Sequence, residues 1–216
     1  MKILTLAQRG LAISSALWTI TSAPGGLQAR NVDPHLPGVE RPQLEVRIFR
    51  LPSVPEGIVK LSAAEAARQF QGLQVTFDWL DCSTPVQAPA CQAPLSPKVI
   101  TIRILPHALP DATEAGLGMT MWSDTGTSAA LFYDRAMALR RPSVPLQRLL
   151  GLAMAHEIVH VLLSRDHTDE GLMAARWSTE YLATGHSGYS GLSRAMEAAI
   201  ESEARRRVSQ ATFTRN

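Results

Sequence analysis

HEIVHVLLSRDHTDEGLM, which runs from His156 to Met173, is the segment around which the rest of this chain can be arranged. It opens with His156 and His160, four residues apart, with Glu157 between them. On a helix, side chains at that spacing lie one above the other on the same face. Both imidazoles can therefore reach one metal ion, and the carboxylate lies beside it, where it can take a proton from water. The segment predicts a catalytic zinc site on a helix.

The helix that carries this motif is predicted over residues 145–164. Pro145 suits a position in the first turn, and the second half is mostly Leu, Ile, Val and Ala apart from the motif residues. A helix this apolar is expected to be buried. Buried histidine and glutamate side chains are costly without partners, and a zinc ion supplies a partner for the two histidines. The alternative is a core helix whose histidines form only hydrogen bonds.

A catalytic zinc site needs three protein ligands and an open position for water. His167 is the expected third ligand, because neutral imidazole is a common zinc ligand. Asp166 is the second candidate, either as a ligand or as the acceptor of an imidazole N–H, and Glu180 is the third. The expected site therefore consists of one Zn²⁺ per chain with the ligands His156, His160 and His167, and Glu157 as the catalytic residue.

These residues resemble the zincin metallopeptidases, and in particular the metzincin-like group with the pattern HExxHxxGxxH/D and a downstream methionine turn. His156, Glu157 and His160 match that pattern, whereas Leu163 stands where the glycine is expected and His167 comes one residue late. The stretch HVLLSRDH also resembles snapalysin-type secreted bacterial proteases, which use an aspartate at the position that Asp166 holds here. The snapalysin resemblance therefore keeps Asp166 open as the third ligand.

A closer resemblance is to secreted bacterial proteins with the pattern HEIGHLLLG…HSxxGxM. In that register His167 is the third ligand and Met173 lies at a tight turn, either as a floor beneath the metal or as ordinary core packing. The likeness extends over residues 54–79, the two cysteines, residues 102–106 and residues 132–135.

The resemblance implies a zinc metallopeptidase, most simply a metalloendopeptidase. Glu157 would act as general base in hydrolysis of the peptide bond, and the hydroxyl of Tyr133 or Tyr181 would help to stabilise the oxyanion. The alternative is a non-catalytic secreted zinc-binding protein with a structural or degenerate site.

The N-terminus has the pattern of a secretory signal. Lys2 and Arg9 precede a mostly apolar run over residues 11–20, which is too short to span a membrane. We therefore expect a signal peptide over residues 1–29, an extended leader over residues 30–43 and a metallopeptidase domain over residues 44–216. The expected location is secreted or periplasmic, without stable membrane insertion once the signal is removed. In an exported chain, Cys82 and Cys91 are expected to form a disulfide.

Charge and composition limit the classes of partner. The chain has 21 Lys and Arg residues against 19 Asp and Glu residues, and residues 1–29 hold two of the basic residues and no acid, which leaves 19 against 19. A balanced charge argues against nucleic acid as a partner, since nucleic-acid-binding proteins show a basic patch or stripe. The run Arg205–Arg207 is more typical of a solvated helix end. The expected partner is a peptide or protein substrate.

The order of the predicted elements indicates an α+β domain. Strands are predicted over residues 44–51, 73–80, 98–105 and 128–133, with a loop and an edge strand within residues 111–127. A helix is predicted over residues 62–71, where Ser62 and Glu65 have the spacing of a capping box, and an amphipathic helix over residues 193–209. We expect a zincin-like domain in which a small twisted sheet packs on the helix of the HExxH motif, followed by a helical C-terminal part.

Overall fold

The computed structural model describes residues 40–83, 89–113, 116–123, 126–164, 166–184 and 191–213. These residues belong to one compact unit, Val39–Asn216. The expected signal peptide and nearly all of the expected leader lie outside the described residues.

A five-stranded mixed sheet forms the framework, with the strand order β2-β1-β3-β5-β4. Its four strands from β2 to β5 pair in parallel, and β4 pairs antiparallel with β5 at one edge. Buried β-branched residues dominate β3, as is typical of a central parallel strand. The strands are β1 (Gln43–Arg50), β2 (Thr76–Asp81), β3 (Val99–Leu105), β4 (Gly118–Ser123) and β5 (Gly126–Phe132).

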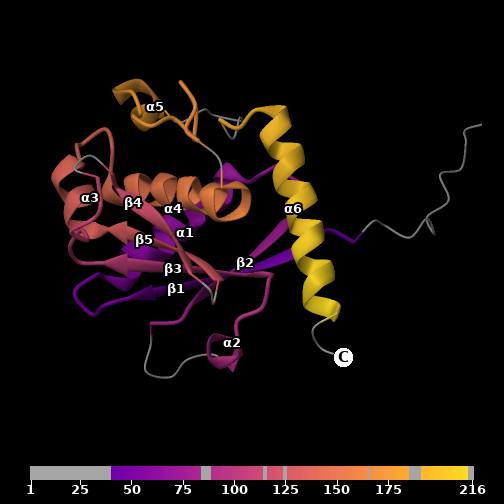
Figure 1. Ribbon diagram of the computed structural model, residues 1–216. Helices are drawn as coiled ribbons and strands as arrows, with labels where there is room; N and C mark the ends of the chain where they lie inside the picture. Colours follow the sequence, from indigo (N-terminus) through magenta and orange to yellow (C-terminus); the bar gives the residue numbers. More distant parts are fainter. Residues whose placement is uncertain are drawn as a thin grey trace, which may run out of the picture. The chain divides into compact units, whose positions relative to one another are not determined.

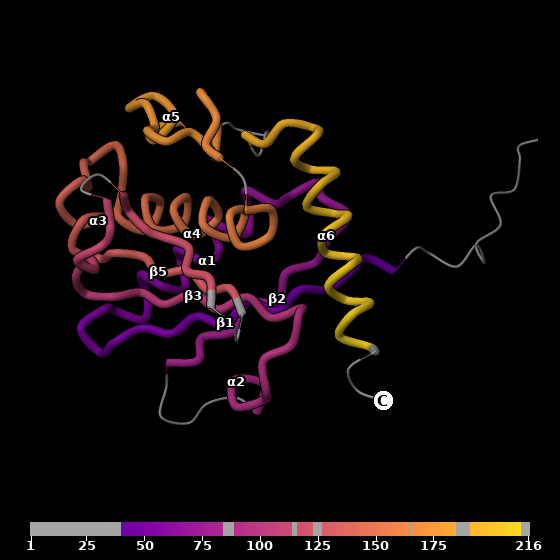
Figure 2. The backbone as a smooth tube through the Cα atoms, viewed as in Figure 1, coloured from indigo at the N-terminus to yellow at the C-terminus, as the bar shows by residue number. Residues whose placement is uncertain are grey.

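Helix α1 connects β1 to its parallel neighbour β2. In Figure 1, α1 and α4 lie on one side of the sheet, and α6 stands at the end of the sheet near β1 and β2. The backbone trace in Figure 2 shows α5 beyond α4, whereas α2 lies below the sheet in this view. The helices are α1 (Glu56–Gln69), α2 (Pro89–Gln92), α3 (Tyr133–Leu139), α4 (Leu146–Leu163), α5 (Thr179–Thr184) and α6 (Arg194–Phe213).

Helix α4 carries the HExxH motif through the centre of the core. Pro145 precedes it in an extended conformation, and Ser164 ends it in the left-handed region with φ 47°. By length and composition α4 is apolar enough to cross a membrane, yet 78% of it is buried inside the protein. It is therefore the core helix of this fold, and the expected α+β arrangement of a sheet packed on the motif helix is confirmed.

The two core helices cross closely at Gly151. A Cβ atom on Gly151 would lie 2.4 Å from Cβ of Glu65 and 2.7 Å from the backbone oxygen of Ser62. Only a residue without a side chain allows α1 to approach α4 at this point. The approach fixes α4 against α1, five residues before the first histidine of the motif.

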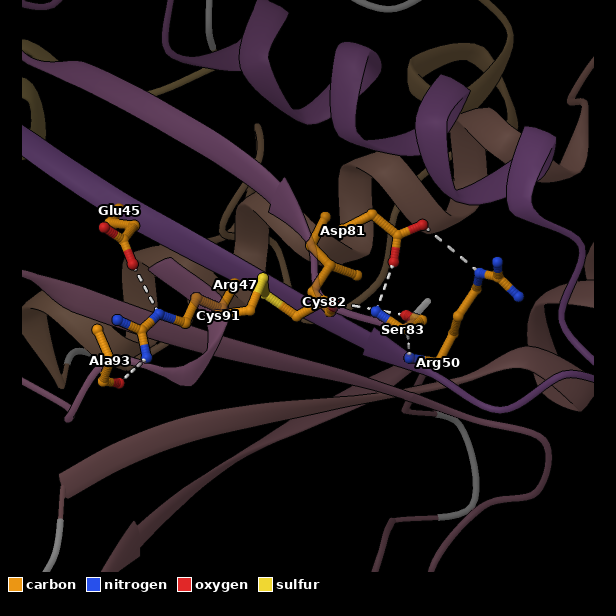
Figure 3. Close-up of a disulfide and its surroundings, with 9 residues drawn as sticks. Glu45, Arg47, Arg50, Asp81, Cys82, Ser83, Cys91 and Ala93 are labelled. Atoms are coloured by element: carbon orange, nitrogen blue, oxygen red, sulfur yellow. Dashed lines mark hydrogen bonds and ion pairs between the residues drawn. A yellow bond between two sulfur atoms is a disulfide. The ribbon is translucent and has the colours of Figure 1, made fainter. Parts of the chain in front are cut away.

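The disulfide between Cys82 and Cys91 is confirmed, with a Cα–Cα distance of 5.4 Å. It ties α2 to the end of β2 (Figure 3). Close by, the buried Arg47 side chain donates to Glu45 at 2.6 Å and to the backbone oxygen of Ala93 at 2.6 Å. A disulfide such as Cys82–Cys91 is typical of proteins from an oxidising compartment.

Three sequence-based expectations about elements need correction. Helix α1 begins at Glu56 after Pro55, six residues before the expected start, so Ser62 is not a cap: its hydroxyl donates to the backbone oxygen of Ile58 inside the helix. Helices α2, α3 and α5 were not predicted. Strand β2 begins at Thr76, three residues later than expected, because Gly72 with φ 97° and the turn after it occupy the preceding positions.

Candidate metal centre

Three histidines bring their ring nitrogens together at the C-terminal half of α4. Nε2 of His160 lies 3.0 Å from Nε2 of His156 and 3.4 Å from Nε2 of His167. In the described part of the chain, these three residues form the group whose ligand atoms all lie within 4.8 Å of one another. Zn–N bonds of about 2.0–2.1 Å in a tetrahedral site place two nitrogens about 3.3 Å apart. The three imidazoles therefore fit one zinc ion.

The hydrogen bonding of His156 orients it for metal binding. Its Nδ1 lies 2.8 Å from the backbone oxygen of Leu172, and that oxygen accepts a second hydrogen bond of 3.0 Å from the indole N–H of Trp177. A carbonyl can only accept, so Nδ1 carries the proton and Nε2 presents a lone pair to the cluster. Burial lowers the pKa of His156 to about 4, opposed by the bond to Leu172 and reinforced by His160 and His167. The imidazole is therefore neutral, as a ligand must be.

Glu157 lines the same cleft as the histidines and is held by the edge strand β4. The hydroxyl of Thr120 donates to Oε2 of Glu157 at 2.9 Å. Two residues earlier, a Cβ on Gly118 would lie 3.0 Å from Cγ of Glu157, so the missing side chain makes room for the carboxylate. Burial raises the pKa of Glu157 to about 7, and the bond from Thr120 opposes that rise. A carboxyl group in this range can accept and return a proton near neutral pH.

These groups open into a cleft of about 690 Å³, which runs along α4. Strand β4 forms one wall through Gly118 to Trp122, and residues 174–177 form another. The N-terminal half of α4 continues the floor away from the histidines. There the lining is apolar, and consists of Leu117, Leu139, Leu149, Ala153 and Leu182. The cleft therefore joins a polar, histidine-lined part to an apolar part.

The cleft wall before β4 is held by Phe132, the last residue of β5, and by Arg135, which follows that strand. The guanidinium of Arg135 lies 5.1 Å from the centre of the Phe132 ring and donates to the backbone oxygens of Thr113 and Gly116, the latter at 2.7 Å. The backbone N–H of Phe132 donates to Leu117 at 2.8 Å. The residues that accept these hydrogen bonds line the cleft: Thr113, Gly116 and Leu117. The contacts of Arg135 and Phe132 therefore set the position of this cleft wall. The contacts give a structural reason for the residues Phe132–Arg135 noted in the sequence.

The other sequence candidates lie elsewhere. Asp166 and Glu180 are exposed and do not join the histidine group. Neither Tyr133 nor Tyr181 is among the residues that line the cleft. Tyr181 is buried, which raises its pKa to about 12 despite the nearby Arg148. Met173 is fully buried in the main hydrophobic core, so its side chain serves core packing.

Sequence reasoning missed four contributors: Thr120, Gly118, Trp177 and the backbone oxygen of Leu172. Thr120 is 37 residues from Glu157, and strand β4 meets α4 only through tertiary folding. No local spacing signals such a contact. The Leu172 carbonyl gives no sequence signal either, because every residue has one. The sequence did predict a tight turn at Gly171–Met173. This turn directs the backbone oxygen of Leu172 toward Nδ1 of His156.

Comparisons with known proteins add a likeness to solved structures. No family model and no curated protein matches this chain. Among solved structures, the crystal structure of archaemetzincin from Methanopyrus kandleri is similar, with a TM-score of 0.45 and 13% sequence identity, over 79% of this chain and 99% of that chain. At this level of similarity, what the site can do follows from its own geometry: three converging imidazoles and a carboxylate at an open cleft.

Proposed function

We propose that this chain is an exported zinc peptidase that hydrolyses internal peptide bonds. His156, His160 and His167 would hold one zinc ion, and Glu157 would serve as general base. The observation that carries the proposal is the meeting of three Nε2 atoms in an open cleft that Glu157 also lines. Export is part of the proposal because a disulfide favours an oxidising compartment.

The chemistry that zinc supplies in such a site is Lewis-acid activation of water and of a carbonyl group. The protein supplies the proton transfers. Thr120 occupies Oε2 of Glu157, which leaves Oε1 to take a proton from the attacking water. The same carboxyl group then returns the proton to the leaving amine. The bond from Nδ1 of His156 to Leu172 fixes the tautomer, so that Nε2 of the neutral imidazole carries the lone pair.

A peptide substrate suits the shape of the cleft. Strand β4 is an edge strand whose outer side has no partner strand in the described part of the chain. An extended peptide can pair with such an edge through its backbone, while pockets select its side chains. The apolar part of the cleft, which includes Leu139, Leu149 and Leu182, offers a place for one apolar side chain.

A non-catalytic zinc site is the second candidate. Structural zinc sites are closed by four protein ligands. Here three histidines converge, the third of them is exposed, and the cluster lines a cleft. Those observations favour the catalytic reading over the structural one.

The test is zinc stoichiometry by mass spectrometry on the purified protein. We expect one zinc per chain, lost or greatly weakened in His156→Ala and in His167→Ala. His107→Ala is the matched control, because His107 is also exposed but lies outside the cluster and pairs with Asp134. Asp166→Ala should also keep the metal. Absence of zinc in the unmutated protein after reconstitution would rule out the metal site.

Glu157→Gln separates catalysis from metal binding. The variant keeps the shape of the side chain but cannot act as a base, so zinc should remain and peptide hydrolysis should fall by roughly 10²–10⁴-fold. Glu170→Gln, at an exposed position, is the control and should keep full activity. Full turnover by Glu157→Gln would remove Glu157 from the mechanism. Retained zinc without hydrolysis of any peptide by the unmutated protein would favour the structural site.

A further inference from the structure

Trp122 has a large apolar side chain that is exposed to solvent at the cleft. It lines the cleft and is 61% exposed. Among the described residues, its indole has no hydrogen bond and no ring contact. Exposed aromatic side chains at a recognition site gain free energy when a ligand covers them, and tryptophan is enriched among such anchors. The position of Trp122 therefore needs an explanation that core packing does not provide.

The alternation of β4 places Trp122 on the active-site face of the sheet. Gly118 and Thr120 both approach Glu157 and therefore face α4. Side chains two residues apart on a strand lie on the same face, roughly 6.7 Å apart. Trp122 is the next residue on that face and lies one such step beyond the residue that holds the catalytic carboxylate. Trp122 pairs with Thr127 of β5 on one side of β4, and the other side of β4 is the edge of the sheet.

A peptide paired with the free edge of β4 would follow the same repeat. Every second side chain of the peptide would share the face of Gly118, Thr120 and Trp122, and residues directly opposite each other in such a pair have Cβ atoms about 4.5–5.5 Å apart. The bond to be cleaved must lie near Glu157 and thus near Thr120. The side chain that meets Trp122 would then come from about two residues along the peptide.

We propose that Trp122 is the specificity-determining residue of a substrate subsite that binds an aromatic or bulky aliphatic side chain, about two residues from the peptide residue opposite Thr120. This subsite is separate from the apolar part of the cleft at Leu139 and Leu149, which lies toward the N-terminal half of α4. The inference rests on the proposed peptidase function and names the class of peptide that it prefers.

The test uses ten-residue peptides on an Ala, Gly and Lys background, with Phe placed at one position at a time. Binding is measured by calorimetry on the zinc-loaded Glu157→Gln protein, which removes turnover, and kcat and KM are measured on the active protein. We expect one Phe position, about two residues from the cleaved bond, to improve binding and kcat/KM. Trp122→Ala should abolish that improvement, a loss of about tenfold in kcat/KM for the Phe peptide relative to the all-background peptide. Trp122→Phe should retain most of it.

Leu95→Ala is the matched control, because Leu95 is 60% exposed and does not line the cleft. It should leave the preference intact. Peptide hydrolysis with the same Phe preference in Trp122→Ala would overturn this inference and leave the peptidase proposal standing. Absence of both binding and hydrolysis for every peptide would overturn both. A dimer of the unmutated protein that dissociates in Trp122→Ala would assign Trp122 to self-association and overturn the subsite.

Discussion

At the scale of single residues, the site depends on side chains and carbonyls that hold the proposed catalytic groups. The buried Glu157 carboxylate accepts from Thr120, and the buried His156 imidazole donates to Leu172. Hydrogen bonds to charged groups contribute more than neutral ones, and a buried group left without its partner bears the full cost of desolvation. Substitutions of the residues that hold Glu157 and the histidines should therefore have measurable effects, as substitutions of the histidines should.

Thr120→Val gives the sharpest test at this scale. The substitution keeps the shape and the β-branch of the side chain but removes the hydroxyl that donates to Glu157. We expect kcat for peptide hydrolysis to fall roughly tenfold or more, with zinc binding unchanged. Thr120→Ser keeps the hydroxyl and should retain most of the activity. Equal losses in both variants would show that packing, and not the hydrogen bond, matters at this position.

At the scale of elements, Phe132 at the end of β5 and Arg135 in α3 hold the cleft wall that precedes β4. Arg135 lies in the first turn of α3 and does not line the cleft, yet it donates to two backbone oxygens of the wall segment. It is a positioning residue, and its removal should affect how substrate is held more than how it reacts.

Arg135→Met should therefore raise KM for peptides several-fold, with a smaller effect on kcat and none on zinc stoichiometry. Arg135→Lys keeps a charged donor and should recover part of the loss. Arg141→Met is the control, because Arg141 is exposed and its guanidinium donates to the backbone oxygens of Ala138 and Arg140, which are close to it in the sequence. A drop in kcat alone would place Arg135 in the chemistry instead.

The elements also show what the sequence could reveal. The motif helix was predicted closely, because Pro145 marks its start and the two histidines lie on one face. The early part of α1 was missed because Ser62 and Glu65 imitate a capping box, while the real start lies at Pro55 and Glu56. Helix α3 was missed because it is one short helix that directly continues a strand. His156 and His160 could be paired from their spacing and His167 was added from a resemblance, whereas the contact between Thr120 and Glu157 depends on how β4 meets α4.

At the scale of the whole molecule, the disulfide and the metal centre lie in different parts of the fold. Cys82 follows β2, and Cys91 belongs to α2, below the sheet in Figure 1, whereas the histidines lie on and after α4. Stability and catalysis should therefore respond separately to the loss of the disulfide.

Replacing both cysteines by alanine should lower the free energy of unfolding by roughly 2–3 kcal/mol, the loop-entropy value for a bond that closes a short segment. Thermal unfolding followed by circular dichroism measures that change. Zinc stoichiometry and kcat/KM of the folded double variant should equal those of the unmutated protein. A loss of zinc at a temperature where the variant is fully folded would contradict the separation.

The carbonyl shared by His156 and Trp177 has an optical consequence. The indole N–H of Trp177 donates to the same Leu172 oxygen as the imidazole, and the two rings meet edge to face with centroids 5.7 Å apart. Any change in the charge or orientation of that imidazole alters the surroundings of the indole directly. We therefore expect the fluorescence of Trp177 to change when a metal ion binds to the three histidines or leaves them. A chelator titration would follow that change without any added dye.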